Sequence, residues 1–132
     1  HYLTAHNSYI LAAAELGFPG LFLFSVILYL STKIPVRVMI DLHDDPDAAV
    51  ARTWGTAMLA AMVGVLVGIF FLSFVYKQML WIYIGLAGAL YSAVKTHRPT
   101  WDVRVGWKEL VLIAIADAGL IAAMFVYTRL KV

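Results

Sequence analysis

The chain has 132 residues, of which 63% are hydrophobic and only 14% are charged, and its mean hydropathy is +0.85. A soluble domain is about 45–50% apolar and about 25% charged, so the composition excludes an ordinary soluble domain and indicates an integral membrane protein. The formal charge of +2 gives no argument for a nucleic-acid partner, and the lack of cysteine excludes a disulfide, a thiol nucleophile and a cysteine metal site.

Four apolar stretches are long enough, or nearly so, to cross a hydrocarbon core of about 30 Å with about 20 helical residues. They cover residues 9–31, 54–75, 79–94 and 109–128. We therefore expect an all-α, polytopic transmembrane helical bundle, with residues 1–132 forming a single domain of four helices. Because the sequence starts at His1 rather than Met, we also expect it to be a fragment or a processed product.

The first stretch opens on a polar cluster, His6-Asn7-Ser8. Histidine titrates near neutral pH and can act as a general base toward a hydroxyl. The start of a helix presents free backbone N–H groups and a positive dipole end, which suit a phosphate. The cluster can thus accept a diphosphate leaving group and deprotonate an acceptor. In the alternative interpretation, Asn7 or Ser8 caps the helix and His6 is a polar residue at the membrane interface.

Glu15 is an acidic residue inside the same apolar stretch, nine residues beyond His6. On a regular helix it lies roughly 13 Å further along and points to nearly the opposite face, so the two residues form no dyad unless the helix breaks. Gly17, Pro19 and Gly20 follow, and Pro19 removes the hydrogen bond to the carbonyl of Glu15. A break here lets the carboxylate turn toward a wet cleft. Alternatively, Glu15 is a structural partner of an arginine on a helix outside this chain.

Two further acidic features lie outside this motif. Asp117 is near the middle of the fourth stretch, where it either lines a proton or ion path or bonds to a neighbouring helix, the interpretation we favour. An acidic cluster in the 32–53 loop suggests a metal site. Asp45 before Pro46 at a helix start explains it better, since acids favour a helix N-terminus. The cluster consists of Asp41, His43, Asp44, Asp45 and Asp47. We predict no metal site and no cofactor.

Basic residues predict the orientation in the membrane. Two loops on one side, residues 32–53 and 95–108, hold seven of them, against three on the other side. The seven are Lys33, Arg37, Arg52, Lys95, Arg98, Arg104 and Lys108, and the three are Lys77, Arg129 and Lys131. Because cytoplasmic loops carry the excess of Lys and Arg, both chain ends and His6 are expected on the outer face.

His6-Asn7, nine further residues, Gly17, two residues, Gly20 and then Phe24 together form a pattern. This pattern resembles the signature of the bacterial O-antigen ligase/polymerase superfamily, which includes O-antigen ligases, O-antigen polymerases and protein O-oligosaccharyltransferases. The resemblance covers about twenty residues strongly and the first 95 weakly. Residues 96–132 have no counterpart in it.

Members of that family transfer a glycan from a polyprenyl diphosphate carrier to a hydroxyl on a lipid, a glycan or a protein. The resemblance implies a multi-pass protein of the bacterial inner membrane with His6 on the periplasmic side. It also implies that His6 either acts as a base on the acceptor or binds the diphosphate of the carrier. It implies substrate-binding roles for Asn7 and Glu15 and a structural role for Gly17, Pro19 and Gly20.

The family's diphosphate-binding arginines come mainly from upstream segments. The resemblance therefore implies that this chain is the C-terminal part of a larger enzyme and is inactive alone. The expected partners are the carrier-linked glycan, the acceptor, the lipid bilayer and other helices of the same or a partner protein. The alternative is a non-catalytic membrane subunit that packs in a larger complex.

Overall fold

The structure, a computed structural model, describes residues 8–71 and 78–130. The described residues confirm the expected all-α class, because they form four long helices and one short 3₁₀ helix. Each long helix is long and apolar enough to cross a membrane. The elements are α1 (Ser8–Asp41), η1 (Pro46–Ala48), α2 (Ala49–Phe71), α3 (Gln78–His97) and α4 (Trp107–Leu130).

The predicted end of the first helix is wrong by ten residues. α1 continues through Pro35 to Asp41, and α2 begins at Ala49, so the connection between them is reduced to 42–48. Hydropathy falls after residue 31 because polar residues begin there, but the helix extends beyond its apolar part. The short gap between the second and third apolar stretches, Tyr76-Lys77-Gln78, predicts a tight hairpin, but Tyr76 and Lys77 lie outside the described residues.

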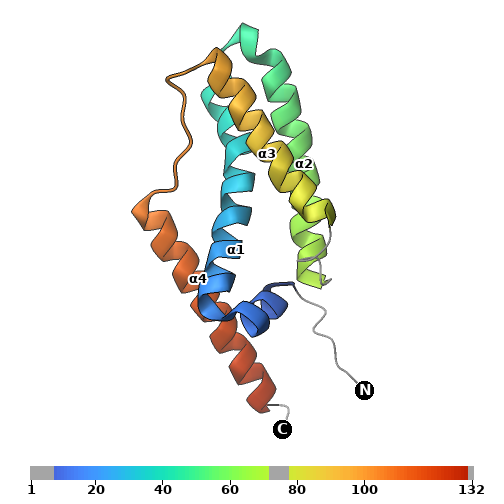
Figure 1. Cartoon of the computed structure of the whole chain (residues 1–132), viewed down its shortest axis with the longest axis vertical. Helices are drawn as coiled ribbons and strands as arrows, with labels where there is room; N and C mark the ends of the chain where they lie inside the picture. Colours follow the sequence, from blue (N-terminus) through green and yellow to red (C-terminus); the bar gives the residue numbers. More distant parts are fainter. Residues whose placement is uncertain (1–7, 72–77, 131–132) are drawn as a thin grey trace.

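α1 is the central helix of the bundle and contacts α2, α3 and α4 (Figure 1). α2 and α3 lie together on one side of it, while α4 runs along the other side. Helices α1 and α2 approach closely at Gly55, where a Cβ atom would lie 3.2 Å from the carbonyl oxygen of Pro35. Small residues at such crossings allow membrane helices to pack by van der Waals contact.

The core has two apolar clusters, one toward each end of α1. One cluster joins Val38 of α1 to Met58 of α2 and Leu90 of α3. The other joins Leu21 and neighbouring α1 residues to Leu80 at the start of α3. Many large apolar side chains outside these clusters are exposed, as a surface facing lipid or further helices requires.

The connections 42–48 and 98–106, around which the basic residues gather, meet at one end of the bundle. Arg98, just after α3, forms an ion pair with Asp45 in the 42–48 connection. The Trp101 indole Nε1 donates a hydrogen bond to Asp41 at the end of α1, at 3.1 Å. These contacts confirm that the two segments share one side.

Candidate functional site

The proposed histidine site begins just before α1. His6 and Asn7 lie outside the described residues, and the described chain begins at Ser8 with the first residue of the helix. The described part of the motif therefore starts with the helical segment that carries Glu15. Glu15 is exposed and lies two residues before a break in the helix.

The break in α1 is located at Gly17. Its φ of 67° and ψ of −170° are not helical, and they fall in a region of backbone space that is essentially restricted to glycine. The first part of α1, dark blue in Figure 1, consequently turns sharply away from the long remainder of the helix. Gly17 thus separates the Glu15 segment from the long remainder of α1.

Gly20 and Pro19 fit the same break. A Cβ atom on Gly20 would lie 2.1 Å from the Cβ of Leu16, a separation that no side chain tolerates. Leu16 comes this close because the chain folds back at Gly17. Pro19 lies in the first turn after the break, where a proline's missing N–H has little effect on helix hydrogen bonding. Glycine or proline at these three positions therefore has a conformational explanation.

The acidic cluster near residue 45 has a structural explanation. The backbone N–H of Asp47 donates to the Asp45 carboxylate at 3.1 Å, so Asp45 caps η1 as the sequence predicts. Arg52 donates to the carbonyl oxygens of Leu42, at 2.8 Å, and Asp45. Within residues 8–71 and 78–130, no three His, Cys, Asp or Glu side chains gather as metal ligands.

The linker between α3 and α4 carries a polar network that the sequence did not predict. The Asp102 carboxylate accepts hydrogen bonds from the Tyr91 hydroxyl at 2.6 Å and from Arg104 Nε at 2.6 Å. Lys95 Nζ lies 3.4 Å from the same carboxylate and donates to the Tyr91 hydroxyl. The hydrogen bond from Tyr91, followed by that from Arg104, lowers the pKa of Asp102 well below its ordinary value.

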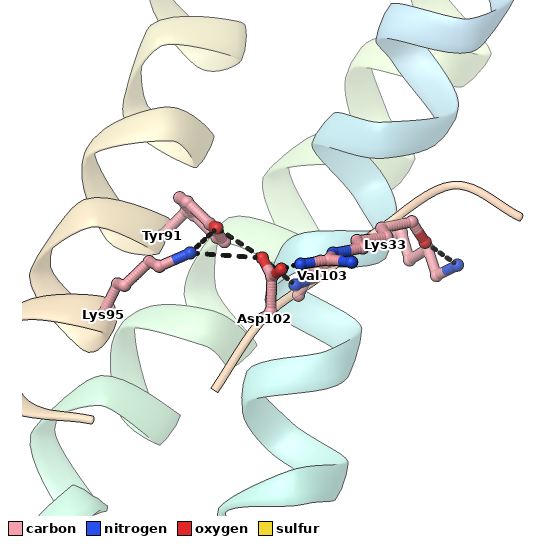
Figure 2. A network of polar contacts seen from close by, with 6 residues as sticks. Lys33, Tyr91, Lys95, Asp102 and Val103 are labelled. Carbon is pink, nitrogen blue, oxygen red and sulfur yellow. Dashed lines mark hydrogen bonds and ion pairs between the residues drawn. The ribbon is translucent and has the colours of Figure 1, made fainter. Parts of the chain in front are cut away.

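A second network joins the start of α4 to α1. Lys33 Nζ lies 2.5 and 2.6 Å from the two carboxylate oxygens of Glu109 and also donates to the backbone carbonyl of Arg104. The Tyr29 hydroxyl donates to Glu109 at 2.5 Å. Figure 2 shows the linker held between Tyr91 and Lys95 on one side and Lys33 on the other.

The two networks share a sequence pattern that was present but unrecognised. Tyr29 and Lys33 on α1, and Tyr91 and Lys95 on α3, are each four residues apart and so lie on one helix face. Each pair binds one acid of the 102–109 segment. Each lysine also lies over the ring of its tyrosine, at 5.6 Å for Lys33 and 5.2 Å for Lys95. The repeated Tyr-x-x-x-Lys spacing was the available signal.

Asp117 is buried in the middle of α4, with 6% of its surface exposed. The Ser25 hydroxyl of α1 donates to its Oδ1 at 2.8 Å, so the predicted bond to a neighbouring helix is confirmed. The other carboxyl oxygen, Oδ2, has no hydrogen-bond partner among the described residues. Asp117 and Ser25 both line a cavity of about 380 Å³ between α1, α2 and α4.

The fold defines this chain as a multi-pass helical membrane protein, with four helices suited to spanning a bilayer. Comparison with protein-family models, with curated proteins and with solved structures finds no match to this chain.

Proposed function

We propose that this chain is the C-terminal part of a membrane glycosyltransferase that moves a glycan from a polyprenyl diphosphate carrier to an acceptor hydroxyl. The observation that supports it best is the spacing from His6-Asn7 through Gly17 to Gly20, which resembles the O-antigen ligase and polymerase signature. A glycine-only break at Gly17 gives that spacing a physical reason, because the conformation excludes other residues there.

The proposed reaction is a displacement at the anomeric carbon of the glycan. The acceptor oxygen forms a bond to that carbon while the bond from the carbon to the carrier's phosphate oxygen breaks. The acceptor's proton passes to the His6 imidazole, and the polyprenyl diphosphate leaves with the bonding electron pair. In the second version of the proposal, His6 is protonated and binds the diphosphate as a cation.

Asn7 and Glu15 are the proposed substrate-binding residues. Asn7 adjoins His6 in the sequence, and its amide can donate to the phosphate oxygens of the carrier or accept from a sugar hydroxyl. Glu15 is exposed, so its carboxylate is accessible to a hydroxyl-bearing substrate. The break at Gly17 follows Glu15, and the chain from Ser8 to Glu15 is helical, so in this proposal Glu15 and the start of α1 contact different parts of the substrate.

The proposed location is the inner membrane of a bacterium, with His6 on the periplasmic side. The basic residues that flank the 42–48 connection, and those in and beside the 98–106 linker, are toward the opposite end of α1 from the motif, and such residues favour the cytoplasm. A lipid-linked glycan and an outward acceptor are both accessible from the periplasmic face.

Replacing His6 with alanine in the intact protein tests the proposal. We expect glycan transfer in a strain lacking the native copy to fall by at least about 100-fold, the usual effect of losing a general base. The readouts are glycan attached to the acceptor and protein level in the membrane. His43→Ala is the matched control, because His43 is exposed in the 42–48 connection at the other end of α1.

Loss of transfer at unchanged protein level in His6→Ala, with normal transfer in His43→Ala, supports the enzyme. Normal transfer and intact assembly in His6→Ala contradict it and favour the non-catalytic subunit.

A further inference from the structure

One of the two carboxyl oxygens of Asp117 lacks a hydrogen-bond partner within the described part of the chain, whether the group is ionised or protonated on that oxygen. If it is ionised, Oδ2 is a buried anionic oxygen that lacks a donor, and a charge at the bilayer centre costs about 2.5–3.5 kcal/mol on insertion scales. If it is protonated on Oδ2, the new O–H lacks an acceptor, which is also unfavourable for a buried polar group. The described side chains around it supply neither, and the cavity that Asp117 lines gives a partner room to bind.

The cavity that Asp117 lines offers oxygen atoms in apolar surroundings. Its polar side chains are the Asp117 carboxyl and the hydroxyls of Ser25, Tyr29 and Thr32. The Ser25 hydroxyl donates to the Asp117 carboxylate, and the Thr32 hydroxyl donates to the Leu28 carbonyl. Because both hydroxyls act as donors in these bonds, the bonds do not use the lone pairs of their oxygen atoms. The rest of the described lining is aliphatic.

These features select the charge and the hardness of the missing partner. Oxygen-only donors suit a hard cation, and no basic side chain is among the described residues that line the cavity. One carboxylate neutralises one positive charge. A divalent ion would leave an uncompensated charge at bilayer depth, which is as unfavourable as the bare carboxylate.

We propose that Asp117 and Ser25 form an intramembrane binding site for a monovalent cation, either a proton or Na⁺. Neither Asp117 nor Ser25 is among the residues assigned to glycan transfer, and the proposal does not depend on that activity.

A line of polar side chains connects this site to the basic end of the bundle. Tyr29 lines the cavity and donates to Glu109, which binds Lys33, and Lys33 reaches the carbonyl of Arg104 in the linker. Chains of this kind mark proton and ion pathways in membrane proteins.

The charged and titratable groups facing the site are few. From α1 they are Tyr29 and, beyond it, Lys33; from α4 the next one is Glu109, and the described residue that α2 contributes is Leu66. Lys33 and Glu109 neutralise each other, so the charge of Asp117 is balanced by the bound cation.

The test uses the intact protein in lipid nanodiscs, with thermal unfolding followed by tryptophan fluorescence. NaCl replaces choline chloride at constant ionic strength and pH. If Na⁺ binds, wild-type Tm rises with Na⁺ concentration and saturates, because a ligand that binds only the folded state stabilises it. Asp117→Asn abolishes the rise and Ser25→Ala raises the half-saturating concentration several-fold. Asp44→Asn, which removes an exposed loop carboxylate, retains the wild-type response.

Infrared spectroscopy of the same samples tests the proton. If a proton binds, the spectrum contains the C=O stretch of a protonated carboxyl that disappears in Asp117→Asn, persists in Asp44→Asn and declines in wild type as pH rises. A Na⁺ response or this titrating band supports the site. The proposal is overturned if wild type shows neither the Na⁺ response nor the titrating band, or if the carboxyl stays protonated at every pH. Both outcomes are read from wild type, so they do not depend on whether Asp117→Asn folds.

Discussion

Gly17 holds a backbone conformation that almost any side chain would destabilise. With φ at 67° and ψ at −170°, a non-glycine residue is disfavoured by about 1–3 kcal/mol. Gly20 is constrained differently, because its Cβ would collide with Leu16 brought back by the break. The two glycines of the motif thus have separate physical causes, a dihedral at one and a close approach at the other.

We expect Gly17→Ala to destabilise the protein by about 1–3 kcal/mol, and to weaken glycan transfer if the break orients the His6 segment. Unfolding in nanodiscs measures the first effect and the transfer assay the second. Gly64→Ala is the control: a Cβ atom on Gly64 would meet nothing within 4 Å, and an alanine in a helix interior gains about 0.5–1 kcal/mol over glycine. Equal stabilities of the two variants would contradict the role assigned to the Gly17 conformation.

At this scale the sequence predicted residues whose effect is local. The glycine and proline residues after Glu15 predict a helix break through their own backbone properties, and Asp45 before Pro46 predicts a helix cap. It did not predict the networks of Asp102 and Glu109, and for Glu109 the reason is that only the fold brings its partners near. Asp102 bonds within its own region of the chain, but Glu109 needs Tyr29 and Lys33, which are 80 and 76 residues away in sequence.

At the scale of elements, the linker between α3 and α4 is held at both of its ends by polar contacts. Asp102 in the linker is hydrogen-bonded to Tyr91 of α3, and Glu109 at the start of α4 forms an ion pair with Lys33 of α1. Glu109 also accepts the backbone N–H of Gly106 at 2.7 Å, which satisfies a donor at the start of α4. The linker therefore sets where α4 begins along α1.

The lowered pKa of Asp102 predicts a pH dependence of stability. Because folding favours the ionised carboxyl, its stabilising contribution is complete above the ordinary value of 3.8 and is lost as pH falls through the lower folded-state pKa. We expect wild type to be more stable than Asp102→Asn near neutral pH, with the difference in Tm shrinking below that value. Thermal unfolding of both proteins from neutral to acidic pH measures it.

Asp44→Asn provides the comparison for that experiment, since Asp44 is an exposed acid in the other connection. Its difference from wild type should be small across the same range. A difference for Asp102→Asn that grows on acidification would contradict the assigned network.

Helix boundaries show where sequence reasoning stops at this scale. Apolar composition predicts which residues face a membrane, and it identified all four helices. It cannot predict how far a helix extends into water, which is why the polar end of α1 was expected to be a loop. Residues 32–41 stay helical while Pro35 and Val38 pack in the bundle interior.

For the whole molecule, the arrangement of the helices makes the orientation testable. The 42–48 connection meets the start of the 98–106 linker at one end of the bundle. The linker then runs back alongside α1, and α4 begins part of the way along α1 and continues away from that end (Figure 1). The charge bias then predicts that residues 42–48 and 98–106 are cytoplasmic, and that the end of α4 is outside.

Single cysteines test this orientation, because the chain contains no cysteine of its own. Thr100→Cys lies in the exposed linker and Leu130→Cys at the exposed end of α4, and neither removes a charge that contributes to the bias. With a membrane-impermeant maleimide, we expect Leu130→Cys to react in cells with a permeabilised outer membrane and Thr100→Cys to react only after the inner membrane is opened. The unsubstituted parent gives the background from any cysteine elsewhere in the intact protein. The reverse pattern would put His6 in the cytoplasm, on the side away from a periplasmic acceptor, and would contradict the proposed glycan transfer together with the orientation.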